Sequence, residues 1–186
     1  EADTEPGWVE ASLGLPVMVK PALEGSSIGM SKVDDADALP AAYREAAAFQ
    51  GKVLAERWIE GEEYTVAILG DTPLPVIGLE TPREFYDYEA KYQADSTRYH
   101  CPCGLPKKQE QQLQALTLQA FRAVAASGWG RGDFMLDANS QPWLIEVNTV
   151  PGMTDHSLVP MAARVYGWDM PELVWRLLET SMDKQV

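Results

Sequence analysis

The sequence predicts an α+β protein in which most strands are antiparallel and the chain forms two lobes. Short apolar segments bounded by glycine, proline and asparagine recur between longer helical segments, a pattern typical of mixed strands and helices. Two of these strands are separated by only four turn residues, so they are expected to pair as an antiparallel hairpin. The 186 residues are enough for one large domain or for two small lobes with cores.

The first part of the chain is expected to contain strands and one helix. Residues 1–12 are acidic and have no clear period, so we expect a linker or a frayed end. A helix is predicted over residues 34–49, because acidic residues open the segment, Pro40 lies in its first turn and alanines follow. Strands are predicted over residues 15–21, up to Val33, and over residues 52–59, 63–69 and 74–79.

The second part is expected to contain the hairpin and three helices. Residues 81–105 are polar and aromatic without a steady period, and loops of this length are usually functional or disordered. The longest helix is predicted over residues 108–127, with apolar residues along one face and Gly128 as its C-terminal stop. Strands are predicted over residues 131–137 and 142–148, and helices over residues 157–166 and 171–181.

The charge and the composition disfavour several classes of partner. The net charge of −13 repels both a nucleic-acid backbone and an anionic membrane, whereas a small anion such as ATP depends on its local site. No apolar run is long enough to span a membrane and no secretory leader opens the sequence, so a soluble, cytoplasmic protein is expected. Cys101 and Cys103 flank a proline next to His100, but a closed zinc site needs about four ligands, so ordinary reduced thiols are expected.

The predicted hairpin brings polar side chains together. Glu146 and Asn148 are two residues apart on one strand, so their side chains lie on the same face, and the four-residue turn places Asp133 opposite Glu146. Paired carboxylates repel each other unless a cation lies between them, and few protein oxygen ligands suit Mg²⁺. Arg131 shares this face. The alternative is an ordinary hairpin with acidic residues on its solvent-exposed face.

Two further segments suggest phosphate binding. Gly25 and Gly29 permit a tight turn whose backbone N–H groups point inward, and Ser26 and Ser27 add hydroxyl donors. Lys20 precedes this turn and adds a positive charge, although a plain hairpin explains the same residues. The second segment, residues 85–92, is either a lid that brings Lys91 to a transferred group or an aromatic anchor for the loop.

Six segments together resemble the D-alanine–D-alanine ligases, in the order found in that family. The resemblance runs from about Leu13 to the last helix. The segments are Val19–Pro21, Glu24–Met30, Phe85–Tyr92, Gly128–Arg131, Glu146–Asn148 and Pro151–Pro160.

The resemblance implies an ATP-grasp fold, with a small lobe at residues 13–57 and a large lobe at residues 58–186 that hold ATP between their sheets. Residues 81–105 would be the lid of the large lobe. The implied reaction joins two D-alanines through a D-alanyl phosphate for peptidoglycan synthesis, with ATP and two Mg²⁺ ions that Mn²⁺ could replace. The complete enzyme would be a homodimer with an N-terminal domain that this sequence does not contain, so this fragment alone is expected to be inactive.

The resemblance also assigns roles to single residues. Lys20, Ser26 and Ser27 would contact the phosphates of ATP, and Lys91 the γ-phosphate. Arg131 and the backbone N–H of Gly152 would stabilise an oxyanion, and Ser157 would bind the second D-alanine carboxylate. The implied adenine and ribose contacts are Glu56, Arg57, Trp58, Ile59, Glu63, Phe85, Met135 and Ile145. The implied Mg²⁺ ligands are Asp133, Glu146 and Asn148, and Tyr92, which the missing domain would orient together with Ser26, favours the dipeptide product.

Some residues depart from the family pattern. Gly132 stands where an aliphatic residue is usual, which could loosen the strand that carries Arg131 and Asp133. Two alternative functions stay open. One is a non-catalytic nucleotide-binding module, and the other is an ATP-grasp carboxylate–amine ligase with a different acceptor.

Overall fold

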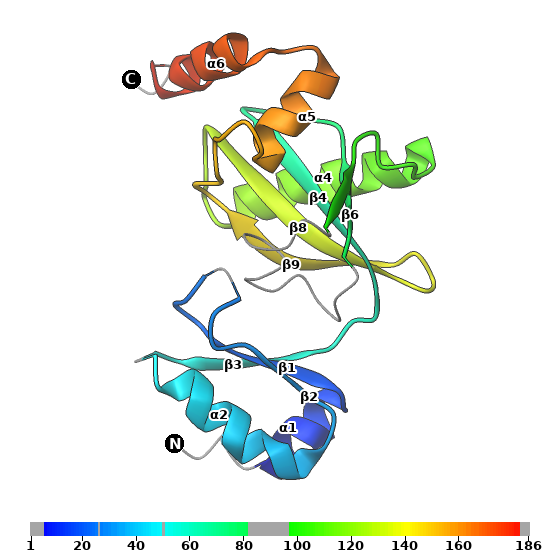
Figure 1. Cartoon of the computed structure of the whole chain (residues 1–186), viewed down its shortest axis with the longest axis vertical. Helices are drawn as coiled ribbons and strands as arrows, with labels where there is room; N and C mark the ends of the chain where they lie inside the picture. The colour runs from blue at the N-terminus through cyan, green and yellow to red at the C-terminus, as the bar shows by residue number, and fades with distance from the viewer. Residues whose placement is uncertain (1–5, 26, 50, 82–96, 183–186) are drawn as a thin grey trace. The chain divides into compact units, whose positions relative to one another are not determined.

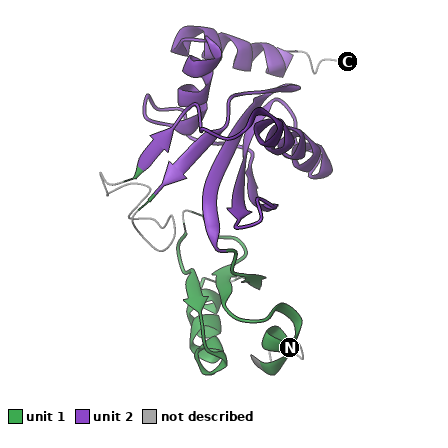
Figure 2. Cartoon of the chain, turned by 90° about the vertical axis from the view of Figure 1, so that its right-hand side faces the viewer, with its two compact units in different colours: residues 1–59, 81–97 green, residues 60–80, 98–186 purple. Residues whose placement is uncertain are grey.

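The structure is a computed structural model, and it describes residues 6–25, 27–49, 51–81 and 97–182. The chain divides into two compact units, which Figure 2 shows in different colours. Unit 1 comprises Glu1–Ile59 and Thr81–Thr97, and unit 2 comprises Glu60–Glu80 and Arg98–Val186. The division after Ile59 lies two residues beyond the lobe boundary that the resemblance implies, and the expected lid segment is shared between the units.

Unit 1 is built on a three-stranded antiparallel sheet with helices against one face (Figure 1). The strand order is β2–β1–β3, where β1 is Val17–Pro21, β2 is Ser31–Val33 and β3 is Val53–Arg57. The 3₁₀ helix η1 (Ala36–Ala38) leads into α2 (Leu39–Ala47), so the predicted helix is shorter than expected. The core of unit 1 consists of Val17, Val19, Val33, Leu39, Ala42 and Ala46.

Helix α1 (Pro6–Leu13) corrects the expectation of a linker or a frayed end over residues 1–12 for the part that the structure describes. Val9 and Leu13 are four residues apart, so they lie on one helical face, and both pack against the core of unit 1. Pro6 is compatible with the first turn of a helix. Only these few apolar side chains distinguish the segment from a linker, because its stability comes from tertiary packing.

Unit 2 is built on an antiparallel sheet in the order β7–β6–β4–β8–β9, with the short strand β5 paired to β4. The long strand β4 therefore lies in the middle of the sheet and β9 at its edge. The strands are β4 (Gly61–Leu69), β5 (Thr72–Pro73), β6 (Ile77–Glu80), β7 (Arg98–His100), β8 (Trp129–Asp137) and β9 (Pro142–Asn148).

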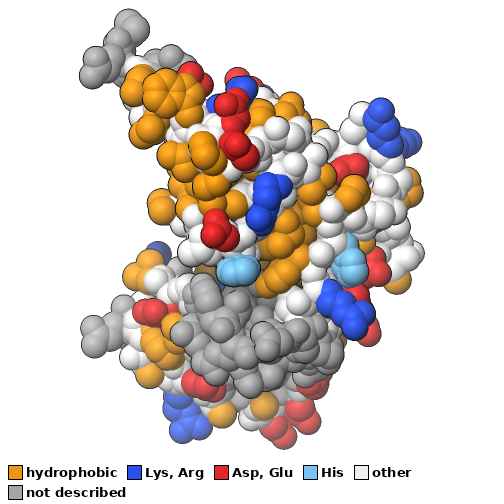
Figure 3. Space-filling model, turned by 45° about the horizontal axis from the view of Figure 1, so that its top comes forward, with side chains coloured by type: hydrophobic (Ala, Val, Ile, Leu, Met, Phe, Trp, Pro, Cys, Tyr) orange, Lys and Arg blue, Asp and Glu red, His pale blue; other side chains and the backbone are white. Residues whose placement is uncertain are grey.

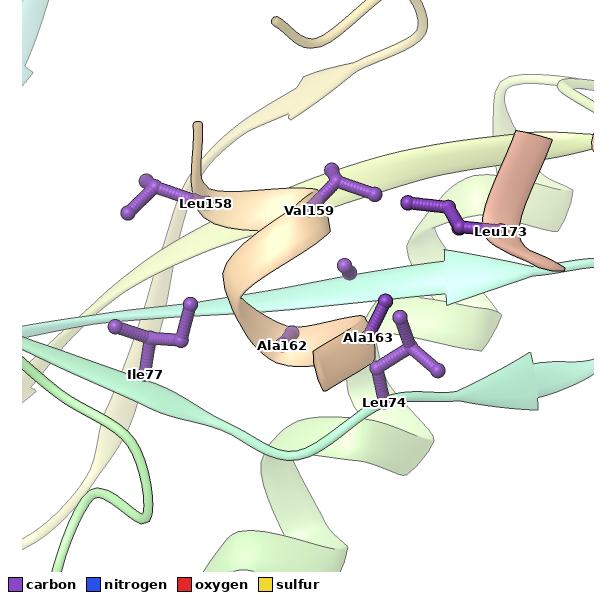
Figure 4. Close-up of a cluster of buried hydrophobic side chains, with 8 residues drawn as sticks. Leu74, Ile77, Leu158, Val159, Ala162, Ala163 and Leu173 are labelled. Atoms are coloured by element: carbon purple, nitrogen blue, oxygen red, sulfur yellow. The ribbon is translucent and has the colours of Figure 1, made fainter. Parts of the chain in front are cut away.

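Three helices cover the two faces of this sheet. Helix α4 (Lys107–Ala123) packs on the face that carries Tyr64, Val66 and Phe134. Helices α5 (Leu158–Tyr166) and α6 (Met170–Met182) pack on part of the opposite face; Figure 4 shows their contacts with β4 and the β5–β6 segment. This second core consists of Ala67, Leu74, Ile77, Leu158, Val159, Ala162, Ala163 and Leu173.

The predicted helices of unit 2 are present, with different ends. Helix α4 stops at Ala123, five residues before the expected stop at Gly128. The left-handed conformation that ends a helix is taken earlier, by Ala125 (φ 53°). Among the described helices, none is long and apolar enough to cross a membrane.

The β8–β9 hairpin has the predicted pairing at its functional end, for a reason that the sequence analysis did not anticipate. Asp133 pairs with Glu146 and Arg131 pairs with Asn148, as expected for a four-residue turn. Nearer the turn, however, Met135 pairs with Trp143 and Leu136 with Pro142, one residue out of that register. A β-bulge between Asp133 and Phe134 restores the predicted register, because Ile145 is an extra residue without a partner on β8.

At Gly132, α4 packs so closely on β8 that little space is left for a side chain. A side-chain carbon at this position would lie 2.9 Å from Thr117 Cγ2 and 3.2 Å from Thr117 Oγ1. Thr117 is fully buried, and its hydroxyl donates to the carbonyl oxygen of Leu113 on its own helix. Thr117 therefore closes the space beside Gly132 on the α4 side of the sheet.

We predict that Gly132→Ala destabilises unit 2 by about 1–3 kcal/mol, because the added methyl group overpacks a closed contact. Thr117→Ser removes the methyl group that the new carbon would meet. The double variant should therefore be more stable than the sum of the two single effects implies. Urea unfolding of the four proteins measures this coupling, and simple additivity would contradict the packing explanation.

Candidate functional site

The candidate site of unit 2 is organised around the side chain of Asp133, which is only 6% exposed. Its Oδ1 accepts hydrogen bonds from Arg131 Nε at 2.8 Å and from Thr65 Oγ1 at 2.5 Å. Its Oδ2 accepts from Arg131 Nη2 at 2.8 Å and from Asn148 Nδ2 at 2.7 Å. A carboxylate offers about four lone-pair sites, so this carboxylate is fully hydrogen-bonded. Such compensation is what a buried charge requires.

The strand pairing explains why these groups meet. Thr65 on β4, Asp133 on β8 and Glu146 on β9 are consecutive partners across three strands, so they form one row on one face of the sheet. Ala67, Arg131 and Asn148 form the next row. The three predicted oxygen donors and Arg131 therefore do lie together. Thr65 was not among the predicted site residues.

The donor set fits a hard divalent cation. Asn148 Nδ2 lies 2.7 Å from Asp133 Oδ2 and 3.3 Å from Glu146 Oε1, so both carboxylates reach one common point. Two carboxylates and an amide are oxygen ligands of the kind that Mg²⁺ and Mn²⁺ prefer. Asn148 directs its N–H₂ group at the carboxylates, so its amide must turn over before its oxygen can bind a cation there. Within the described ranges, no cluster of three His, Cys, Asp or Glu residues offers a site for a metal ion.

The predicted apolar and ribose contacts in unit 2 flank the Asp133 row. Glu63 pairs with Met135, and Met135 pairs with Trp143, so these residues form the next row on the same face. Ile145 is the extra residue of the bulge and therefore departs from strict alternation. In a regular strand it would lie on the α4 face, opposite to Glu146; bulges commonly redirect side chains in this way.

Gly152 and Ser157 lie together in the turn that leads into α5. A side-chain carbon on Gly152 would be 2.9 Å from Ser157 Oγ, so only glycine fits without displacing the serine. Ser157 Oγ accepts a hydrogen bond from the backbone N–H of Thr154 and shares another with Thr154 Oγ1, both at 2.9 Å. The serine hydroxyl is therefore held in a defined position at the start of the helix.

Unit 1 carries its own polar face, on the side of the sheet away from α2. Lys20 forms an ion pair with Glu56 across β1 and β3, so two predicted nucleotide contacts lie against each other. Lys32 stacks on the ring of Trp58, with its Nζ 5.0 Å from the ring centroid. Lys32 pairs with Met18, which shares the face of Lys20, so a second cation that the sequence analysis missed also lies here.

The other predicted residues of unit 1 differ in their placement. Arg57 pairs with Val17 on the helix-covered face, and its Nε donates to the carbonyl oxygen of Leu13, so its side chain is directed away from Lys20. Ser27 takes a left-handed conformation (φ 62°), and Ile59 follows β3 at the end of unit 1. Ser26, Phe85, Lys91 and Tyr92 lie outside the described residues.

The chain matches the family model of the D-ala D-ala ligase C-terminus over residues 2–179. It belongs to this family. It is 59% identical over 184 residues to a D-alanine–D-alanine ligase of Nitrosococcus oceani, covering 99% of this chain and 58% of that protein. It is 62% identical over 174 residues to the enzyme of Alkalilimnicola ehrlichii, covering 94% of this chain and 56% of that protein.

Solved structures of ligases have the same fold. The D-alanine–D-alanine ligase of Bacillus anthracis complexed with ATP is 30% identical, with a TM-score of 0.79 over 93% of this chain and 54% of that one. The VanG D-Ala:D-Ser ligase of Enterococcus faecalis is also 30% identical, with a TM-score of 0.83 over 92% of this chain and 51% of that one. These likenesses confirm the predicted α+β ATP-grasp fold. The chain spans little more than half the length of these ligases.

The two cysteines of this ligase-family chain are free thiols that pack against the core of unit 2. Burial raises the pKa of Cys101 from 9.0 to about 11, and the nearby Cys103 and Glu110 add to this shift. Burial also raises the pKa of Cys103. A raised pKa keeps a thiol protonated, whereas a metal ligand or a nucleophile must be a thiolate. Their surroundings favour the predicted role as ordinary reduced thiols.

We predict that Cys101 reacts slowly with iodoacetamide at neutral pH, because only the thiolate is nucleophilic. A pKa of about 11 in place of 9.0 lowers its thiolate fraction about a hundredfold near pH 7.5. The alkylation rate, followed by mass spectrometry, should rise with pH until about 11 and should approach that of an ordinary thiol in urea. Rapid labelling of the folded protein at pH 7.5 would show that the thiol is not protected.

Proposed function

We propose that this chain carries the ATP-dependent chemistry of a D-alanine–D-alanine ligase. In this proposal, ATP phosphorylates the carboxylate of one D-alanine, and the amine of a second D-alanine displaces the phosphate to form the dipeptide for peptidoglycan. The observation that carries the proposal is the row of Asp133 and Glu146 with Asn148 and Arg131 alongside. Family membership supports the choice of reaction.

The reaction brings a triphosphate and a carboxylate together, so negative charge must be stabilised. Mg²⁺, held by Asp133, Glu146 and Asn148, would supply this charge neutralisation, with two ions as the family resemblance implies. The bidentate contact of Arg131 orients Asp133, and the planar guanidinium suits that geometry. The carboxylate is therefore positioned before any ligand binds, which is the condition for efficient electrostatic catalysis.

Amine attack on the acyl phosphate creates an oxyanion, and we assign its stabilisation to Arg131 and the backbone N–H of Gly152. A guanidinium has five N–H groups, and two of those of Arg131 donate to Asp133. Ser157, fixed by Thr154, is proposed to donate its hydroxyl to the carboxylate of the second D-alanine. The lack of space for a side chain on Gly152 supports a role for its backbone there.

The nucleotide contacts proposed for unit 1 begin with the ion-paired Lys20, which would exchange Glu56 for the phosphates of ATP. Trp58 and Ile59 would border the adenine, and Arg57 would contribute through its backbone, because its side chain is bound to Leu13. In unit 2, Glu63 would bind the ribose, and Met135 and Ile145 would contact the adenine. Ser26, Ser27, Phe85 and Lys91 complete the proposed ATP contacts, and Tyr92 the proposed catalytic set.

The acceptor is proposed to be D-alanine, in agreement with the relatives at about 60% identity. D-serine is the second candidate, because the VanG D-Ala:D-Ser ligase shares the fold at 30% identity. Phosphate release by a protein extended to the full length of its relatives, with each amino acid as acceptor, separates the two.

Two wider assignments belong to the complete enzyme. We propose that it acts in the cytoplasm, where ATP is available, and that it is a homodimer. Exposed apolar side chains gather at the C-terminal helices near the end of the chain (Figure 3), and they include Val174, Trp175, Leu178 and Met182 of α6. A patch of this kind is typical of protein–protein interfaces.

We predict that millimolar Mg-ATP raises the melting temperature of this chain by about 5–10 °C when the ligand is near a hundred times its Kd. Glu146→Gln should abolish most of this rise, because it removes one ligand charge while keeping an oxygen that can accept from Asn148. Differential scanning fluorimetry with Mg-ATP, ATP alone and Mg²⁺ alone measures the effect.

The matched control is Glu179→Gln, the same substitution on α6, where the side chain accepts a hydrogen bond from Trp175 Nε1 at 2.9 Å. This variant should keep the full rise. A wild-type chain that shows no shift at millimolar Mg-ATP, or a Glu146→Gln variant that shifts as much as the wild type, would refute the proposed role of the site.

A further inference from the structure

We propose that Thr65 is a positioning residue of the metal site: its hydroxyl fixes the Asp133 carboxylate in the orientation that binds the divalent cation. This inference rests on the proposed function, because it presumes that Asp133 is a metal ligand. It adds a residue from strand β4, which contributes none of the proposed metal ligands.

The hydrogen bond from Thr65 is the shortest contact that Asp133 makes among those described above. Thr65 Oγ1 lies 2.5 Å from Asp133 Oδ1 and 3.3 Å from the carbonyl oxygen of Gly132. A hydroxyl has one proton, and hydrogen bonds to an ionised acceptor are shorter than those to neutral ones. The proton therefore goes to the carboxylate, and a purely structural bond to the backbone does not explain the geometry.

Thr65 and Asp133 are both buried, so loss of their hydrogen bond cannot easily be compensated by water. Thr65 is 2% exposed and Asp133 is 6% exposed, so little water is available to replace a lost donor. Threonine is also stiff about its first side-chain bond, because two heavy atoms are attached to Cβ. Strand pairing sets Thr65 directly opposite Asp133, so the backbone fixes the position of the donor as well. A rigid donor in a rigid sheet restricts the rotation of the carboxylate.

The donors divide into two kinds. Arg131 and Asn148 belong to the proposed chemistry: Arg131 is also assigned to the oxyanion, and Asn148 must turn its amide over to bind a cation. Thr65 faces only Asp133 and the backbone of Gly132 among its described side-chain hydrogen bonds. It can therefore keep Asp133 Oδ1 in place while the contacts at Oδ2 exchange. Partners of metal ligands that act in this way typically change metal affinity by 10- to 100-fold when they are removed.

The test uses Mn²⁺ as the probe, with free Mn²⁺ measured by electron paramagnetic resonance during titration of the 186-residue chain. Thr65→Val keeps the shape of the side chain and removes the donor, and we expect it to weaken Mn²⁺ binding about tenfold. Thr65→Ser keeps the donor and should retain most of the wild-type affinity. If Thr65→Val does not fold, as judged by circular dichroism, Thr65→Ala takes its place.

Thr117→Val is the matched control, because Thr117 is also a buried threonine and lies on the α4 side of the same sheet. It should lower the urea midpoint without changing Mn²⁺ affinity. Unchanged or tighter binding by Thr65→Val, or equal weakening by Thr117→Val, would overturn the role of Thr65. If the wild type binds Mn²⁺ and Glu146→Gln does not, the proposed function survives such a result. A wild-type chain that does not bind Mn²⁺ would overturn both.

Discussion

The buried carboxylate of Asp133 sets the main constraint on unit 2. A carboxyl group at this depth needs hydrogen-bond partners, and four hydrogen bonds from Arg131, Asn148 and Thr65 provide them. These donors come from three adjacent strands, so the central part of the sheet must keep its register for the site to exist. The stability of the sheet and the electrostatics of the site are therefore coupled. On the other face of the sheet, α4 packs closely against Gly130 and Gly132, where Phe121 and Thr117 leave no space for side chains.

The sequence was most informative where the interacting residues are close along the chain. The hairpin places Asp133, Glu146 and Asn148 within 16 residues, so alternation and turn length were enough to predict their convergence. Thr65 is 68 residues from Asp133, and no local pattern indicates that β4 pairs with β8. The same limit applies to Thr117 and Gly132, because the contact of a helix with a sheet is also non-local. Six motifs carried the family resemblance, and the comparisons confirmed it.

Other differences have local causes. The segment of helix α1 was expected to be a linker or a frayed end because its pattern is weak, and the side chains of α1 that pack against the core are Val9 and Leu13. Arg57 was grouped with its neighbours in the nucleotide strand, but alternation directs its side chain to the opposite face from Glu56. Neighbouring residues of one strand can therefore contact a ligand in two ways, some through their side chains and others through the backbone.

In the β8–β9 hairpin, five residues, 137–141, lie between the last paired residues, and Ile145 is one extra residue in β9. Together they give the same Asp133–Glu146 pairing as a regular ladder on a four-residue turn. A deletion of one residue in the turn together with loss of the bulge would leave Asp133 opposite Glu146. Homologous hairpins can therefore differ in length at two separate points and still hold the same ligands. An alignment with a single gap in this region would keep the acidic pair aligned but would misplace the residues between the turn and the bulge, whereas an alignment with two gaps would locate both length changes.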